Sequence, residues 1–207
     1  MRLFHLSDLH IGKRVNEFSM IEDQKYILER ILDLAEKEMP DGVILAGDIY
    51  DKQIPSAEAV QVFDEFITKL AERKFPVFVI SGNHDSAERL AFGGRLLNSR
   101  GIYLSPVYDG TVMKIPIADQ YGTVWIHLLP FIRPAAVRRV FEDESDLITD
   151  VQSAVRAVIS HMEIDPNERN ILVAHQFVTG ASRCESEDIQ VGGLDNIDAS
   201  VFEAFDY

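Results

Sequence analysis

The chain has 207 residues, of which 46% are hydrophobic and 26% are charged, and its formal net charge at pH 7 is −14. That length suits one globular domain with a sizeable core, and no apolar run approaches the roughly 20 residues that cross a bilayer. The N-terminal residues lack the apolar length of a signal peptide, and the single cysteine, Cys184, excludes an internal disulfide. These features favour a cytoplasmic protein.

The acidic balance bears on possible partners. A chain that holds nucleic acid by its phosphates usually presents a basic face, so this charge argues against a stand-alone DNA binder. Bound divalent cations would offset acidic site residues, and a partner subunit could supply the basic surface. Either would reconcile the charge with a DNA substrate.

The N-terminal half alternates between predicted strands and helices. A short strand is predicted at 3–7, and continuous apolar runs predict buried strands at 43–46 and 77–80. Apolar residues at three- and four-residue steps predict helices at 20–38, 56–74 and 86–99. Ser56 is a good N-cap for the second helix, whereas Gly93 and Gly94 weaken the third.

The pattern changes after residue 101. Short apolar runs at 102–104, 112–117 and 124–129 predict antiparallel strands, separated by tight turns at 109–110 and 121–122. A further helix at 147–162 and a strand at 170–174 follow. The acidic stretch 142–146 is expected to be a solvated loop and helix start. Alternating strands and helices followed by hairpins predict an α/β domain with mixed sheets.

Polar side chains gather directly after the predicted strands. These segments are Asp8-Leu9-His10, Gly47-Asp48, Gly82-Asn83-His84 and Ala174-His175. In open α/β sheets the carboxyl ends of the strands form the ligand crevice, so we expect these side chains at one rim. Carboxylate, amide oxygen and imidazole together suit divalent ions such as manganese, iron or zinc. A carboxylate such as Asp48 can bridge two ions, and such a pair can promote in-line phosphoryl displacement.

Each short motif alone is more often an ordinary turn, because glycine, asparagine and aspartate are turn residues. Their recurrence after successive strands favours a shared metal site. The glycines at 47 and 82 would let the chain turn sharply and bring side chains close to the ions. His5 and His127 lie within predicted strands and His161 ends a predicted helix, so we expect all three to be structural.

These four motifs resemble those of the calcineurin-like metallophosphoesterase superfamily. That resemblance implies a four-layer α/β/β/α sandwich with a dinuclear centre. Residues 1–13, the segment 47–51 with Pro55-Ser56, and residues 129–134 are similar more narrowly to the SbcD-like branch of nuclease subunits.

The resemblance implies a role for each motif residue. Asp8 and His10 would bind the first ion, Asn83 and His175 the second, and Asp48 both. The branch also implies that the two divalent ions are manganese.

Three further positions and several partners follow from the same resemblance. His84 would act on the phosphate rather than bind metal, and Asp51 and Asp85 would orient the loops and ligands. The branch implies cleavage of DNA ends and hairpins with an ATP-driven, SbcC-like coiled-coil partner. It also implies a homodimer, for which the candidate apolar residues are Phe63, Phe66, Phe92, Leu96 and Leu97.

One departure from the family pattern stands out. The family continues with a Gly-His-x-His motif after a further strand, and this sequence ends at Tyr207 without it. We therefore expect residues 1–207 to be a nuclease domain without its last strands and capping domain, with weak metal binding and poor DNA cleavage as it stands.

Three functions remain open on sequence alone. The first is a DNA nuclease subunit, which the branch-like segments favour. The second is a metallophosphoesterase for a small phosphomonoester or phosphodiester. The third is a non-enzymatic scaffold with an incidental metal site. Substrate choice depends on the surroundings of the site, which the fold does not fix.

Overall fold

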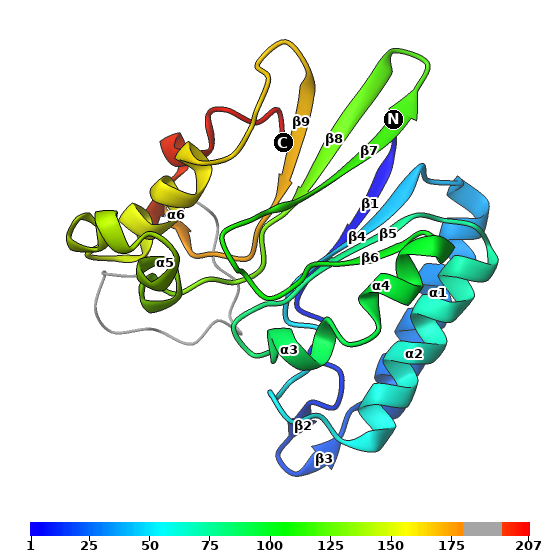
Figure 1. Ribbon diagram of the computed structural model, residues 1–207. Helices are drawn as coiled ribbons and strands as arrows, with labels where there is room; N and C mark the ends of the chain where they lie inside the picture. The colour runs from blue at the N-terminus through cyan, green and yellow to red at the C-terminus, as the bar shows by residue number, and fades with distance from the viewer. Residues whose placement is uncertain (180–195) are drawn as a thin grey trace. The chain divides into compact units, whose positions relative to one another are not determined.

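The computed structural model describes residues 1–179 and 196–207 (Figure 1), so Cys184 lies outside the described residues. The chain divides into two compact units. The first consists of residues 1–107 and 173–175, and the second of residues 108–172 and 176–207. No helix in the described part of the chain has the length and apolar character needed to cross a membrane.

A parallel sheet forms the centre of the first unit. Its strands, in spatial order, are β1 (Leu3–Leu6), β4 (Gly42–Ala46), β5 (Val77–Ile80) and β6 (Ile102–Leu104). Every residue of β4 and β5 is buried, as the continuous apolar runs predicted for strands covered on both faces. The prediction that 102–104 is an antiparallel strand is wrong. Residues 81–101 form a crossover that brings β6 alongside β5 in the parallel direction.

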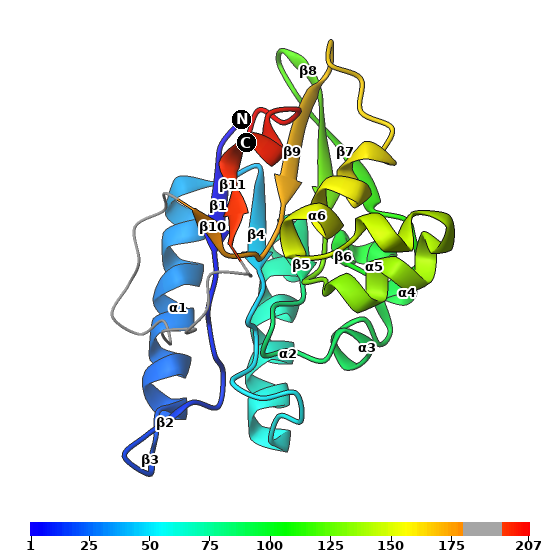
Figure 2. The ribbon, with the colours of Figure 1, turned by 90° about the vertical axis from the view of Figure 1, so that its left-hand side faces the viewer.

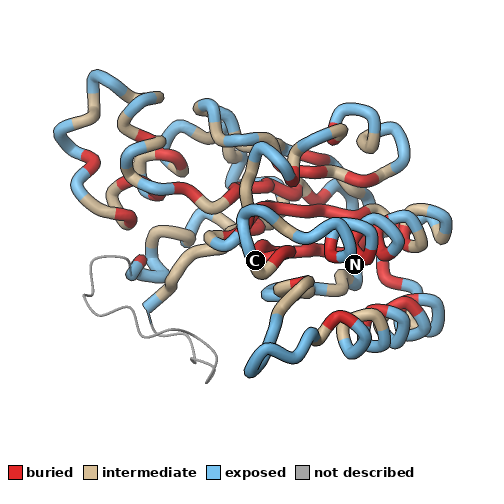
Figure 3. Tube along the Cα trace, turned by 90° about the horizontal axis from the view of Figure 1, so that it is seen from below, coloured by how far each residue is buried: buried red, intermediate tan, exposed pale blue. Residues whose placement is uncertain are grey.

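Two long helices pack side by side on this sheet (Figures 1 and 2): α1 (Ile21–Glu38) and α2 (Ala57–Glu72). Each buries one stripe of apolar residues, so that buried and exposed positions alternate along both helices (Figure 3). The predicted N-cap is confirmed, because Ser56 accepts a hydrogen bond from the backbone N–H of Ala59 at 3.2 Å.

The predicted helix at 86–99 is broken into three pieces. They are α3 (Ala87–Leu90), α4 (Gly94–Leu97) and the 3-10 turn η1 (Asn98–Arg100). The break falls at Gly93, which takes φ = +77°, a left-handed conformation that interrupts the helix. A short hairpin, β2 (Arg14–Val15) with β3 (Phe18–Ser19), was not predicted. Its turn residues, Asn16 and Glu17, have positive φ without the glycine that marks such turns.

The second unit has a three-stranded sheet in the order β7-β8-β9. Its elements, in chain order, are β7 (Met113–Asp119), β8 (Gly122–Leu128), α5 (Pro134–Val140), η2 (Glu142–Leu147), α6 (Val151–Ser160), β9 (Arg169–Val173), β10 (Val178–Thr179), β11 (Ile197–Asp198) and η3 (Ala199–Phe202). The predicted hairpin between β7 and β8 is confirmed, with Asp119 paired to Gly122 across the turn. Near the end of the described chain, Asp206 and Tyr207 hydrogen-bond with the backbone of β9.

Helix boundaries in the second unit differ from those predicted. The acidic stretch forms the 3-10 helix η2 rather than a loop that leads directly into α6. Helix α6 begins later, at Val151, because Asp150 caps it and forms a capping box with Ser153. Helix α5 was missed, although Pro134 at its first position is a typical helix start.

The three histidines expected to be structural lie apart from the potential metal ligands found among the described residues. His5 lies in β1. His127 is buried in β8, with Nε2 3.0 Å from Oδ1 of Asn170. His161 follows the end of α6, and its ring stacks on Phe141.

Candidate metal centre

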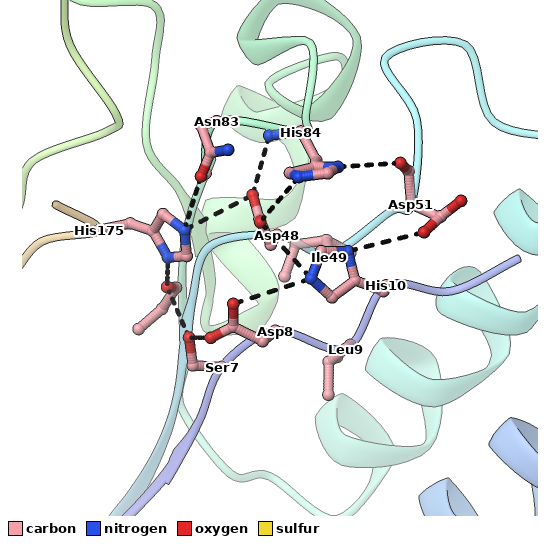
Figure 4. A network of polar contacts seen from close by, with 12 residues as sticks. Ser7, Asp8, Leu9, His10, Asp48, Ile49, Asp51, Asn83, His84 and His175 are labelled. Carbon is pink, nitrogen blue, oxygen red and sulfur yellow. Dashed lines mark hydrogen bonds and ion pairs between the residues drawn. The ribbon is translucent and has the colours of Figure 1, made fainter. Parts of the chain in front are cut away.

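The structure brings together the six side chains that the sequence singled out (Figure 4). Asp8 and His10 follow β1, Asp48 follows β4, and Asn83 and His84 follow β5. His175 reaches the same rim from the short return segment 173–175, which belongs to the first unit. The rim is the carboxyl edge of the parallel sheet, as expected from the placement of polar residues after each strand.

Three of these residues have unusual backbone conformations. Asp8, His10 and Asp48 have φ values of +57°, +43° and +48°. A left-handed residue with a side chain costs roughly 1–2 kcal/mol and persists where its surroundings hold it. Here the two loops hold each other, because His10 N–H donates to the Asp48 carbonyl at 2.9 Å and Asp8 N–H to the Gly47 carbonyl at 3.2 Å.

Asp48 is the centre of the cluster, and only 3% of its surface is exposed. Its two carboxylate oxygens face different neighbours. Oδ2 lies 3.6 Å from Nε2 of His10, and Oδ1 lies 3.6 Å from Nε2 of His175. Oδ1 also accepts the backbone N–H of His84 at 2.9 Å. A carboxylate divided in this way suits a bridge between two ions.

The possible ligand atoms fall into two groups that share Asp48. One contains His10, Asp48 and His84, and the other Asp8, Asp48 and His175, with the atoms of each within 4.8 Å of one another. Asn83 extends the second group, because its Oδ1 lies 3.1 Å from Nε2 of His175. Oxygen and imidazole donors in two adjoining sets fit a pair of divalent cations.

The charges of these groups also suit cation binding. Burial alone would raise the pKa of Asp48, but hydrogen bonds from His175 and the His84 backbone outweigh it and lower that pKa. Burial lowers the pKa of His10, which favours its neutral, ligating form. Burial also acts to lower the pKa of His175, yet the hydrogen bond to Asp48 prevails and raises it. A cation between these two residues would displace that proton.

Two further carboxylates support the loops. Asp85, 6% exposed, accepts backbone N–H groups of Ile49, Tyr50 and Gly82 at 2.8–3.0 Å. Burial raises its pKa despite these three donors. By accepting N–H groups from both segments, Asp85 ties the loop that carries Asp48 to the loop that carries Asn83. Asp51 lies beside His10, with Oδ1 3.8 Å from Nδ1 of that ring.

Glycine is required at two points of close approach. A Cβ on Gly47 would lie 2.6 Å from the His175 ring, and Gly47 also has φ = +88°. A Cβ on Gly82 would lie 2.1 Å from Oδ1 of Asp48 and 2.3 Å from its backbone nitrogen. Any side chain at these positions would push the cluster apart.

Sequence reasoning missed two residues that contact the site loops. The hydroxyl of Ser7 hydrogen-bonds to the Asp8 carboxylate and lies 3.2 Å from the Ala46 carbonyl. Gln24, in the first turn of α1, contacts the loop that carries His10. Ser7 adjoins the first motif and could have been suspected from its position. Gln24 lies outside every motif and carries no comparable signal.

The calcineurin-like phosphoesterase family matches residues 1–198, so the chain belongs to that family. This match confirms the predicted family and its α/β fold class. The chain is 35% identical over 211 residues to a protein of Staphylococcus epidermidis named as the D subunit of the nuclease SbcCD. It is 34% identical over 210 residues to the protein of the same name from Staphylococcus saprophyticus.

Both alignments cover 100% of the chain, but 55% and 54% of those proteins. The chain thus spans about half the length of the curated relatives it matches. A crystal structure of TT1561 from Thermus thermophilus aligns with 93% of the chain and 73% of that protein, with a TM-score of 0.48 and 11% identity.

The close approach of Gly82 to Asp48 can be tested by adding one methyl group. We expect Gly82→Ala to displace Asp48 and to weaken the binding of divalent cations by about 10-fold or more, since loss of ligand orientation typically has effects of that size. Gly94→Ala is the matched control, because its Cβ would lie an ordinary 3.5 Å from Leu104. Calorimetric titration of the full-length protein measures both. Unchanged affinity in Gly82→Ala would contradict the steric argument.

Proposed function

We propose that this chain is the metal-binding part of a divalent-metal-dependent DNA nuclease. It would hydrolyse phosphodiester bonds in DNA ends and hairpins as a subunit of an SbcCD-type repair and recombination complex. The observation that carries the proposal is Asp48, a buried carboxylate whose two oxygens face separate donor groups. It is supported by similarity, along the whole chain, to proteins named as nuclease subunits.

The side chains divide between two ions, which we propose to be Mn²⁺. Asp8 and His10, whose Oδ1 and Nε2 lie 3.8 Å apart, would hold the first. Asn83 and His175 would hold the second, and both would share Asp48. Asp8 also lies within the group of Asp48 and His175, so it stands between the two positions. Such a pair, when bound, activates water and stabilises the attacking and leaving oxygens of a phosphoryl displacement. The protein's own contribution is to keep the five ligands converged without substrate, through the buried Asp48 and the loops that Asp85 joins.

His84 is the candidate for direct action on the phosphate. Its ring is partly exposed, and Nδ1 lies 3.1 Å from the Asp51 carbonyl, so the proton on Nδ1 donates to that oxygen. Nε2 then faces the rim, 4.0 Å from Oδ2 of Asp48. In the imidazolium form, in which Nε2 carries a second proton, Nε2–H can stabilise developing charge on the phosphate or protonate the leaving oxygen. The backbone carbonyl of Asp51 thus orients the His84 ring, while its carboxylate lies beside the His10 ring.

We further propose the partners of the complete protein. The name SbcCD given to the relatives implies a second subunit, for which we propose an SbcC-like ATPase with coiled coils. A basic surface on that subunit would compensate for the net charge of −14 carried by this chain. A nuclease for chromosomal DNA has to reach that DNA, so we place the complex in the cytoplasm.

The substrate class is tested with the full-length protein in Mn²⁺. We expect cleavage of linear and hairpin DNA at rates well above hydrolysis of bis-p-nitrophenyl phosphate. Samples treated with a chelator provide the control for metal dependence. Hydrolysis of the small ester alone would instead favour a phosphoesterase for small substrates, and no hydrolysis by metal-loaded protein would favour a scaffold.

Replacing His84 separates catalysis from metal binding. We expect His84→Gln in the full-length protein to retain both Mn²⁺ ions and to lower turnover by roughly 10²–10⁴-fold, the usual contribution of an acid–base group. His161→Gln is the control, since that ring lies at the end of α6. Loss of one ion in His84→Gln would make His84 a ligand, in keeping with its place beside His10 and Asp48.

We also propose a homodimer formed through Phe92, which lies between α3 and α4, and Leu96 of α4. Phe92 and Leu96 are 87% and 80% exposed, more than any other large apolar side chain that the structure describes. Together they offer an apolar face to a second copy of the chain. Phe63 and Phe66, the alternative apolar residues, are buried in the core and are excluded.

Charge placed on this surface should therefore dissociate the dimer. We expect Phe92→Asp combined with Leu96→Asp to convert the full-length protein to monomers in sedimentation velocity at micromolar concentration. Tyr26→Asp, at an exposed position on α1, should leave the dimer intact. A monomeric unaltered protein, or a dimer that survives both charges, would refute the proposed interface.

A further inference from the structure

Gln24 makes an unusually complete set of contacts with the first motif loop. Its Nε2 donates to the Leu9 carbonyl at 3.0 Å and to the His10 carbonyl at 2.8 Å. Its Oε1 accepts the backbone N–H of Gly12 at 2.9 Å. Both N–H groups and the oxygen of the amide are therefore used, all on one loop. The residue lies in the first turn of α1, whose own backbone is anchored in the core through Ile21 and Leu28.

These bonds complement those made by the Asp48 loop. The N–H groups of His10 and Ile11 donate to the carbonyls of Asp48 and Ile49, both at 2.9 Å. Gln24 binds the carbonyls of Leu9 and His10. The peptide groups on both sides of His10 are thus fixed by partners from two different elements, the loop that follows β4 and helix α1.

The position of the His10 ring depends strongly on this backbone. Its Nδ1 is buried and has no hydrogen-bond partner among the described residues, the nearest carboxylate oxygen of Asp51 being 3.8 Å away. Metal-ligating histidines usually donate the second ring nitrogen to an acceptor that fixes the ring. Without that anchor, the left-handed backbone of His10, at φ = +43°, determines where Nε2 points.

We propose that Gln24 is a positioning residue for the metal centre. It holds His10 in the conformation that directs Nε2 towards the first ion, without contacting ion or substrate itself. This inference rests on the metal centre proposed above. The role requires a side chain with two donors and one acceptor at this length, which among the amino acids only glutamine provides.

Two substitutions separate the parts of this contact. Gln24→Met keeps the length of the side chain and removes all three hydrogen bonds. Gln24→Glu keeps the acceptor for Gly12 N–H but loses both donors and sets a carboxylate against two carbonyl oxygens. Gln61→Met is the matched control, because Gln61 is exposed on α2 and bonds only to Glu65 among the described side chains.

The test uses the full-length protein, calorimetric titration with Mn²⁺, and hydrogen exchange of the metal-free protein. We expect both Gln24 variants to weaken one ion by about 10–100-fold, the usual effect of removing a group that orients a ligand, and to leave the other within a few-fold. Gln24→Met should also speed exchange at Gly12, whereas Gln24→Glu should preserve protection there. Melting temperatures should fall below that of Gln61→Met, because three hydrogen bonds are lost, but exchange along α1 beyond Gln24 should stay unchanged.

Several outcomes would overturn the inference. Unchanged affinity for both ions would show that His10 needs no support from Gln24. Equal weakening of both ions, with faster exchange throughout α1, would show a general structural role. Absence of Mn²⁺ binding in the unaltered protein would overturn the proposed metal centre instead. In that case exchange at residues 9–13 would still decide whether Gln24 holds the loop.

Discussion

The carboxylate of Asp48 is nearly inaccessible to solvent, yet its lowered pKa keeps it ionised. Burying a charge is costly unless partners compensate for it. Here the compensation comes from His175, from the backbone N–H of His84, and from His10 facing the second oxygen. Together with Asp48, these partners belong to four separate chain segments. The buried charge therefore requires the segments to converge, and the rest of the site is arranged around it.

Close packing of backbone against side chain makes that convergence possible. Gly47 lets the His175 ring lie against the strand end, and Gly82 lets its loop approach Asp48. Asp85 then joins the two loops through three backbone N–H groups. Asp48 thus supplies a charged side chain to the site, whereas Asp85 holds the two loops together. The distinction between them is geometric, since both are buried carboxylates after a strand.

The sequence was informative where a local pattern has one structural meaning. The buried strands β4 and β5, the Ser56 cap and the clustering of polar residues at strand ends could all be predicted. The direction of β6 could not, because a three-residue apolar run is equally compatible with parallel or antiparallel pairing. The glycines at 93 and 94 indicated a weak helix but not a break in it. The turn between β2 and β3 was missed because it lacks the glycine that signals positive φ. Gln24 was missed because its role depends on tertiary contact with a distant loop.

The left-handed backbone of Asp8 and Asp48 has a consequence for how such sites tolerate change. Each position must satisfy a side-chain requirement and a conformational one at the same time. Asparagine, like aspartate, adopts this conformation readily, whereas alanine resists it. Asparagine therefore removes the charge while preserving the path of the chain, and alanine alters both. Relatives that lose function at these positions should therefore carry asparagine more often than alanine. Their loops would keep the same backbone path, although the site would have lost a carboxylate.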